Sequence, residues 1–338
     1  MSPIAKAEPT TLASWCATLV RALDAQGLDG RALAQRAGVD LAALDEADGR
    51  VPRLALTQLW RLAVEATADP CFGLTTARFT AQTSFHALGY ASLASATLAE
   101  AFHRAVRFRR MVGDVLELSL VQHGDVYRFT IDVSAPPGAP FEAVDAIAAL
   151  SVRIARLLRG DRDFNPLRVL LQRPEPRGSE TYARVFRAPV LFEQEINALE
   201  YPRAEFDARL PTANAELARQ NDQVATRYIE RLARPSLSAR VQQALLDALP
   251  NGAPSKPALA RQLGMSPRSL QRHLADEGTS FEELLTELRG TLARNYLTER
   301  RLNVTEVAFL LGFADTSTFS RAFKRWTGKA PSEFATSA

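Results

Sequence analysis

The sequence lacks the features that mark exported, membrane-spanning or disulfide-rich proteins. It has only two cysteines, Cys16 and Cys71, and their separation fits no zinc or redox motif, so we expect both to be reduced, buried thiols. No apolar run approaches the roughly 18 residues that a membrane-spanning helix needs, and no basic start precedes an apolar segment. We therefore expect a cytoplasmic protein with no membrane partner.

Catalytic motifs are missing as well. The chain contains no GxSxG, no P-loop, no GxGxxG opening a helix and no HExxH. Its four histidines, His86, His103, His123 and His273, lack the spacing of metal ligands. We expect a protein that is not an enzyme and that holds neither a metal nor another cofactor.

The length and composition are those of a folded protein of more than one domain. The chain has 338 residues, of which 46% are hydrophobic and 23% are charged, and such a length usually exceeds what one hydrophobic core serves. The net charge of +3 arises entirely in residues 237–338, which hold 13 Lys and Arg against 10 Asp and Glu. A solvated surface explains this small excess as well as a nucleic-acid footprint does.

The first two thirds of the chain has a mixed pattern. Residues 11–79 and 97–112 show helical spacing of apolar side chains, and so do residues 144–158. Residues 116–121 and 127–133 alternate with period two around His123-Gly-Asp, which predicts a β-hairpin. Short strands are expected at 167–171 and 190–192. We therefore expect residues 1–210 to form an α+β domain.

A polar helix is expected at residues 214–232. Its apolar residues fall on one narrow stripe and comprise Leu217, Val224, Tyr228 and Leu232. Such a stripe suits pairing with a twin helix, and it suits packing against its own domain equally well. We assign residues 211–236 to a helical linker, a candidate dimer seam, and residues 237–338 to an all-α domain.

One pattern occurs twice in that all-α domain, and it is the most specific signal in the chain. In both copies a small Ala precedes a Gly by four residues, as Ala260 with Gly264 and as Ala308 with Gly312. Two helices that cross steeply need a small residue at their contact and a residue that tolerates positive φ in the turn. Ser266 and Asp315 follow at N-cap positions. The repeat predicts two helix-turn-helix units.

A long helix is expected to join the two units. Residues 281–297 carry a continuous apolar face and would form a rod of about 26 Å, against about 34 Å for one turn of DNA. Such a rod would set two recognition helices in successive major grooves, so that a single chain reads an asymmetric site.

Residues 238–335 resemble the DNA-binding domain of the AraC/XylS family of transcription regulators. The run from Phe319-Ser-Arg-Ala-Phe-Lys to Gly328-Lys-Ala-Pro-Ser-Glu-Phe334 carries the resemblance. The resemblance implies base contacts and phosphate contacts, and the side-chain chemistry agrees with both. The implied base-contacting residues are Arg268, Gln271, Arg272, Thr316, Ser317, Thr318 and Arg321. The implied phosphate-contacting residues are Ser266, Lys324, Arg325 and Lys329.

Residues 12–209 resemble, more loosely, the arabinose-binding type of regulatory domain of the same family. The best match is Leu88-Gly-Tyr-Ala-Ser-Leu, followed by Arg104-Ala-Val-Arg-Phe-Arg-Arg. The resemblance implies effector sensing and dimerisation, without making arabinose the ligand. Aromatic and cationic side chains would hold a small anionic or aromatic effector, although the arginines also suit a solvated helix face. The candidate contacts are Phe85, His86, Tyr90, Arg107 and Arg109.

The sequence therefore predicts a DNA-binding transcription regulator that responds to a small-molecule effector. Its expected partners are double-stranded DNA, the effector, a second copy of the chain and RNA polymerase. Two alternatives stay open: a C-terminal helical module that binds proteins, and a catalytic N-terminal domain fused to a DNA reader. The sequence is compatible with activation and with repression of transcription.

Overall fold

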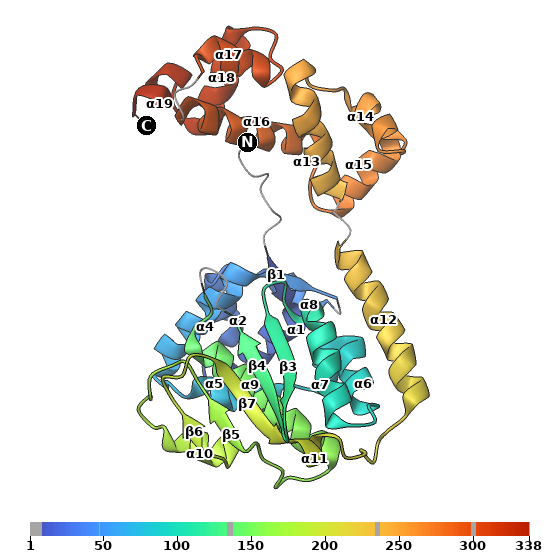
Figure 1. Cartoon of the computed structure of the whole chain (residues 1–338). Coiled ribbons are helices and arrows are strands. Elements are labelled where there is room, and N and C mark those ends of the chain that lie inside the picture. Colours follow the sequence, from blue (N-terminus) through green and yellow to red (C-terminus); the bar gives the residue numbers. More distant parts are fainter. Residues whose placement is uncertain (1–8, 47, 134–137, 234–236, 299–301, 338) are drawn as a thin grey trace. The chain divides into compact units, whose positions relative to one another are not determined.

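The computed structural model describes residues 9–46, 48–133, 138–233, 237–298 and 302–337. The chain forms two compact units, Met1–Leu232 and Ala233–Ala338, shown in Figure 1. The predicted domain boundary at residue 236 lies outside the described residues. Among the described residues, no helix combines the length and apolarity needed to cross a lipid bilayer.

The N-terminal unit begins with a helical part, as the apolar spacing predicts. A short antiparallel pair, β1 (Thr10–Leu12) with β2 (Arg50–Pro52), ties the start of the chain to the start of α4. The predicted helix over 97–112 is in fact two helices, because Phe108 leaves helical geometry with φ −103° and ψ 15°. The helices of this part are α1 (Ala13–Asp24), α2 (Gly30–Arg36), α3 (Leu41–Asp45), α4 (Arg53–Thr67), α5 (Phe72–Thr76), η1 (Ala77–Phe79), η2 (Gln82–Phe85), α6 (His86–Leu93), α7 (Leu98–Arg107) and α8 (Arg109–Val112).

A five-stranded sheet follows, in the order β3-β4-β7-β5-β6. The predicted hairpin is confirmed as an antiparallel pair that matches Leu120 with Phe129. The central strand β7 was not predicted, and it pairs antiparallel with both β4 and β5. The strands are β3 (Glu117–His123), β4 (Val126–Asp132), β5 (Arg168–Leu170), β6 (Val190–Leu191) and β7 (Asn197–Pro202). The helices of this half are α9 (Phe141–Arg159), α10 (Glu180–Phe186) and α11 (Arg203–Phe206).

Aromatic rings fill the space between the sheet and α7. The ring of Phe102 lies 4.8 Å from that of Phe129 on β4 and 5.0 Å from that of Phe206. Tyr201 on β7 stacks on Phe206 at 4.6 Å. All four side chains are buried, and rings of this size contribute much of a core's hydrophobic free energy. The α+β class expected for this part of the chain is confirmed.

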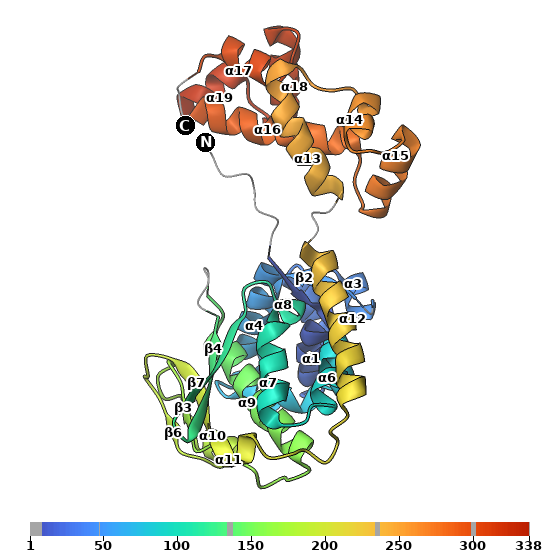
Figure 2. The ribbon, with the colours of Figure 1, turned by 45° about the vertical axis from the view of Figure 1, so that its right-hand side comes forward.

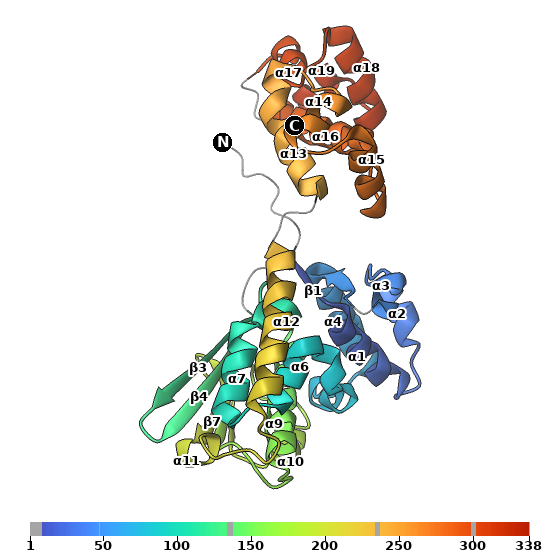
Figure 3. The same ribbon diagram turned by 90° about the vertical axis from the view of Figure 1, so that its right-hand side faces the viewer.

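Helix α12 (Ala215–Ala233) covers the segment expected to be a linker, and it packs on the N-terminal unit. Figures 2 and 3 show it running alongside α6 and α7. Ala225 and Tyr228 are buried against Leu88 and Phe108. Asp222 accepts a hydrogen bond of 3.0 Å from Nε of Arg104 on α7. One face of α12 is therefore part of the core of this unit.

The C-terminal unit is helical within its described residues, as expected. Its elements are α13 (Leu237–Ala248), η3 (Leu249–Asn251), α14 (Lys256–Gln262), α15 (Pro267–Asp276), α16 (Phe281–Thr298), α17 (Val304–Leu310), α18 (Thr316–Thr327) and α19 (Pro331–Ser337). In Figure 1, α14 and α15 lie at one end of α16, and α17 and α18 lie at the other. Two separate hydrophobic clusters form, one around Leu270 and Leu274 and one around Phe319 and Phe323. Each cluster uses its own half of α16.

Candidate DNA-binding surface and effector cavity

The first helix-turn-helix unit is α14, a tight turn and α15. Gly264 has φ +71° in the turn. The amide of Gly264 donates to Arg261 O at 3.0 Å, and the amide of Met265 donates to Ala260 O at 2.9 Å. These two bonds form a Schellman motif, which satisfies the last carbonyls of α14. Oγ of Ser266 then accepts from the amide of Ser269 at 3.1 Å and caps α15.

The second unit repeats this geometry with α17 and α18. Gly312 has φ +68°, and a Cβ built on it would lie 2.7 Å from the amide nitrogen of Ala253, so glycine is required both by conformation and by space. The amide of Phe313 donates to Ala308 O at 3.0 Å. Asp315 caps α18 by accepting from the amide of Thr318 at 2.7 Å, and this bond lowers the pKa of the Asp315 carboxyl. The buried Ala260 and Ala308 occupy the same place in the two units.

The predicted base-contacting residues lie on the solvent side of α15 and α18. Six of the seven are exposed, and Thr316 is half-buried. The buried residues of the two helices, Leu270 with Leu274 and Phe319 with Phe323, point the other way. The structure thus places the residues of each set together on one exposed face: Arg268, Gln271 and Arg272 on α15, and Thr316, Ser317, Thr318 and Arg321 on α18.

The predicted base-contacting residues differ in whether their side chains already bond to other residues of the protein. Among the described residues, Arg268 makes no hydrogen bond or ion pair, and Arg321 forms no ion pair at contact distance. By contrast, Oε1 of Gln271 accepts from Nζ of Lys256 at 3.4 Å, and the Thr318 hydroxyl donates to Asp315 at 2.8 Å. The two arginines therefore have their guanidinium groups available for a base edge.

The predicted phosphate contacts surround these faces. Lys324 and Arg325 are exposed in the last turns of α18, and Lys329 is exposed just after it. The hydroxyl oxygen of Ser266 is already the cap of α15, which leaves its proton free to donate. Such groups position a protein on DNA without reading its sequence.

Sequence reasoning missed Arg289 on α16. Its Nε donates to Leu311 O at 2.9 Å and its Nη2 donates to Gly312 O at 3.0 Å. The guanidinium also lies 4.4 Å from the ring centroid of Phe313. Arg289 therefore binds the turn of the second unit to the connecting helix. The only local signal was the Arg289-Gly290 pair within an otherwise regular helix. A local sequence pattern does not show that Arg289 bonds to Leu311, which follows it by 22 residues.

Glu277 has a related role in the first unit and was missed as well. Its two carboxylate oxygens accept from the amides of Leu237 and Ser238, each at 2.8 Å. Burial alone would raise the pKa of Glu277, but the hydrogen bonds from Ser238 and Leu237 outweigh burial and lower it. The carboxylate thus caps α13 from the end of α15.

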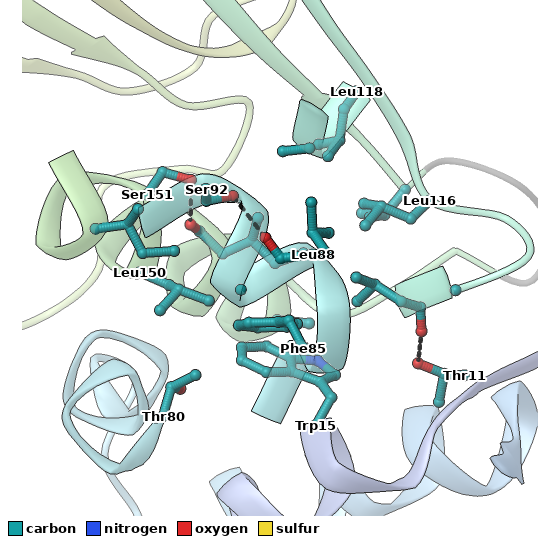
Figure 4. Close-up of a pocket in the computed structure, with 18 of the residues that line it drawn as sticks. Thr11, Trp15, Thr80, Phe85, Leu88, Ser92, Leu116, Leu118, Leu150 and Ser151 are labelled. Carbon is teal, nitrogen blue, oxygen red and sulfur yellow. Dashed lines mark hydrogen bonds between the residues drawn. The ribbon is translucent and has the colours of Figure 1, made fainter. Parts of the chain in front are cut away.

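The N-terminal unit contains an apolar cavity of about 200 Å³ between its helical part and the first hairpin. Figure 4 shows Trp15 and Phe85 together in this cavity, with ring centroids 6.2 Å apart. Leu88, Phe102, Leu118 and Leu150 contribute further apolar surface. A concave apolar site of this kind is the ordinary form of a small-molecule site.

Of the five predicted effector contacts, only Phe85 lines this cavity. His86 faces Asp48 at 3.5 Å and Tyr228 on α12, and Tyr90 is exposed. The guanidinium of Arg107 lies over the ring of Phe108. Arg109 pairs with Glu117 at 2.7 Å. The structure does not bring these four to Phe85 in one site, because each is engaged in a contact elsewhere or faces solvent.

Comparison with known proteins agrees with both units. A model described as the arabinose-binding domain of AraC transcription regulator matches residues 27–210, and a helix-turn-helix domain model matches residues 259–337. The ornithine utilization regulator of Pseudomonas aeruginosa is 34% identical over 310 residues, which are 91% of each chain. An uncharacterized HTH-type transcriptional regulator of Mycobacterium tuberculosis is 30% identical over 88% of each chain. The crystal structure of the regulator CdpR from Pseudomonas aeruginosa shares 27% identity over 95% of this chain and 97% of that one, with a TM-score of 0.47.

The fold, the paired turns, the two domain models and the 34% identical relative together define a DNA-binding transcription regulator with an effector-binding type of N-terminal domain. The chain belongs to the AraC/XylS family.

Proposed function

We propose that the chain regulates transcription by placing α15 and α18 in two successive major grooves, under the control of a small molecule held in the N-terminal cavity. The observation that carries the proposal is the pair of equivalent turns at the two ends of α16. A helix of 18 residues spans about 27 Å, close to the roughly 34 Å of one DNA turn. In this role the protein acts in the cytoplasm, where bacterial DNA lies, and the N-terminal unit senses rather than catalyses.

The two recognition helices would read different sequences. On α15, Arg268 is suited to O6 and N7 of guanine, and Gln271 and Arg272 lie on the same face. On α18, Arg321 would do the same beside the methyl-bearing side chains of Thr316 and Thr318. One chain would therefore recognise an asymmetric site, and Lys324, Arg325 and Lys329 would fix its register on the phosphates.

Arg268→Ala tests the base-reading role. We expect it to weaken binding to the cognate site by about 1–3 kcal/mol and to relax the preference at one base pair. The measurement is a titration of the full-length chain with a series of single-base variants of its own promoter site. Lys324→Ala is the matched control, because loss of a phosphate contact should weaken all sites alike and lower the salt slope by about one. Equal losses for Arg268→Ala on every site would refute the assignment.

The cavity supports the effector part of the proposal. It is lined by elements from both halves of the N-terminal unit, including α1, α4, α6, α7, α9 and the β3–β4 hairpin. A ligand there would alter how these elements pack, which is the physical basis on which a small molecule shifts a protein between states. The relative named for ornithine utilization suggests an amino-acid effector, but the described residues of the cavity lining include no carboxylate to pair with an ammonium group.

We also propose that the chain forms a homodimer through the free side of α12. Leu217 and Val224 are 45% and 46% exposed, and their spacing of seven residues puts them on one face of the helix. Tyr228 and Leu232, which completed the predicted stripe, pack on the N-terminal unit instead. The stripe is thus divided between the unit's own core and a surface suited to a second copy.

Leu217→Glu combined with Val224→Glu is expected to convert the dimer to monomers, since four like charges would then face one another across the seam. Light scattering coupled to size-exclusion chromatography gives the mass directly. Leu54→Glu, a change of an equally exposed leucine on α4, should leave the dimer intact. A dimer mass retained by the double variant would place the interface elsewhere.

A further inference from the structure

Most of the hydrogen-bonding groups in the wall of the N-terminal cavity already have partners within the protein. Most of its serine and threonine hydroxyls donate to backbone carbonyls, as Ser92 does to Leu88, Ser151 to Ile147 and Thr57 to Arg53. Thr80 and Trp60 differ: they are 3% and 2% exposed, and Oγ1 of Thr80 and Nε1 of Trp60 have no hydrogen-bond partner among the described residues. A fully polar ligand would leave most of its own groups unpaired in such a wall, at a cost of about 1–3 kcal/mol for each.

The lining residues that remain exposed mark where the cavity opens. They are Ala81, Arg153 and Leu157. Arg153 and Leu157 lie one turn apart on α9, and Nη1 of Arg153 donates to the carbonyl of Thr80 at 2.7 Å, next to Ala81. The mouth is therefore formed by α9 and the segment between η1 and η2.

This mouth is strongly cationic. Besides Arg153, Arg21 donates to the carbonyl of Phe79 at 3.2 Å, and Arg78 lies 5.9 Å from the centre of the Phe79 ring. In the part of the chain that the structure describes, none of these three arginines forms an ion pair, and the lining itself holds no Asp or Glu. Unpaired guanidinium groups are well suited to bind a carboxylate through two parallel hydrogen bonds.

We propose that the cavity binds a monocarboxylate with an apolar tail, which lies inside the cavity while its carboxylate pairs with Arg153 at the mouth. This inference rests on the proposed function, in which the cavity is the effector site. An engineered cavity of about 150 Å³ accepts benzene, so the 200 Å³ available here corresponds to a tail of roughly eight carbons by proportion. Thr80 offers its free hydroxyl to one polar atom within the tail or to the carboxylate.

Tryptophan fluorescence of the full-length protein provides the test. Trp15 and Trp60 both line the cavity, whereas Trp326 belongs to the C-terminal unit. The probes are octanoate, 1-octanol and L-ornithine. We expect octanoate to bind, 1-octanol to bind about tenfold more weakly because it has no charge, and L-ornithine not to bind.

Variants separate the tail from the head group. Arg153→Gln should weaken octanoate binding about tenfold and leave 1-octanol unchanged, and Arg153→Lys should restore most of the loss. Ser151→Leu fills the cavity and should weaken both probes. Arg110→Gln, a change of an exposed arginine on α8 outside the lining, should affect neither. The thermal midpoint of each variant checks that it is folded.

Three results would overturn the inference. If octanoate and 1-octanol bound with equal affinity, and Arg153→Gln changed neither, the proposed pairing of a carboxylate with Arg153 would be refuted. If L-ornithine bound and Ser151→Leu abolished that binding, the cavity would still be the effector site. Its ligand would then be a polar amino acid and not a monocarboxylate with an apolar tail. No binding of any probe would refute the inference alone, because the DNA titrations of Arg268→Ala judge the proposed function without any ligand.

Discussion

Replacement of Arg173 by methionine is expected to lower the free energy of unfolding of the N-terminal unit by about 3–5 kcal/mol, the usual cost of leaving one member of a buried ion pair alone. Arg173 is 5% exposed and pairs with Asp145, which is fully buried on α9. Tyr182 donates to the same carboxylate oxygen at 2.6 Å and accepts from Arg173 at 2.7 Å. Methionine has a similar length but would leave the carboxylate without a cation.

The effect of Arg173→Met should grow with pH. Burial raises the pKa of Asp145 to about 7, although Arg173 and Tyr182 oppose this shift. A carboxyl whose pKa is raised on folding favours the folded state at low pH, and that contribution is lost as pH rises through the folded-state pKa. Without Arg173 the folded-state pKa rises further, so the loss continues to a higher pH. The penalty should therefore be small near about pH 5 and larger near about pH 8, growing by up to about 1.4 kcal/mol for each pH unit above the pKa of Asp145 in the unaltered protein.

Urea unfolding of the full-length variant at these two pH values, followed by the emission of Trp15 and Trp60, measures the penalty. Arg184→Met on α10 is the matched control, because Arg184 is exposed and, among the described residues, hydrogen-bonds to Thr181 alone; it should cost well under about 1 kcal/mol. A penalty for Arg173→Met that is equally small, or that does not change with pH, would contradict this account of the network.

Phe323→Ala is expected to unfold the second helix-turn-helix unit while the first survives. Phe323 is fully buried, with its ring 5.7 Å from Phe319 and 5.4 Å from Phe334. Truncation of a buried phenylalanine costs about 3–5 kcal/mol, a large share of the stability available to a core of this size. The core of the first unit contains none of these rings, so α15 should remain folded and bound to its half of the site.

The readout is the region of promoter DNA that the variant protects from hydroxyl radicals. Phe323→Ala should remove protection at one half of the site only. Leu274→Ala, which truncates the buried face of α15, should remove the other half. If either change abolished both halves together, the two units would form one cooperative core rather than two.

The double helix-turn-helix arrangement could be predicted because local chemistry determines it. The turns need glycine at positive φ, the helix crossings need alanine, and the caps need Ser266 and Asp315, so each unit leaves a readable pattern within about 20 residues. Repetition of that pattern in one chain made a chance match improbable. The hairpin β3–β4 was predictable for the same reason, since its period-two alternation is local.

Features that depend on distant partners could not be predicted in this way. Strand β7 is buried along most of its length, so it shows no alternation of apolar and polar residues. Its Glu200 is a charged residue in a core strand, and it is accommodated there by Arg128 and Arg168 from the neighbouring strands. The cavity is formed by segments from Thr10 to Leu158, and no local pattern assembles them.

The predicted effector site shows the same limit. Phe85 lines the cavity, and its role as an effector contact stays a prediction. Arg107 and Arg109 were grouped with it because they are near in sequence and cationic. The arginine at the mouth of the cavity is Arg153, which lies in a helix whose other residues are mostly apolar core.

The most direct test of the central claim is a hydroxyl-radical footprint of the unaltered full-length protein on its own promoter. Two helix-turn-helix units at the ends of α16 should protect two patches on one face of the duplex, about one helical turn apart for each bound chain. The base preferences within the two patches should differ and should respond separately to Arg268→Ala and Arg321→Ala. A single protected patch for each chain, or two patches with the same sequence preference, would contradict the account.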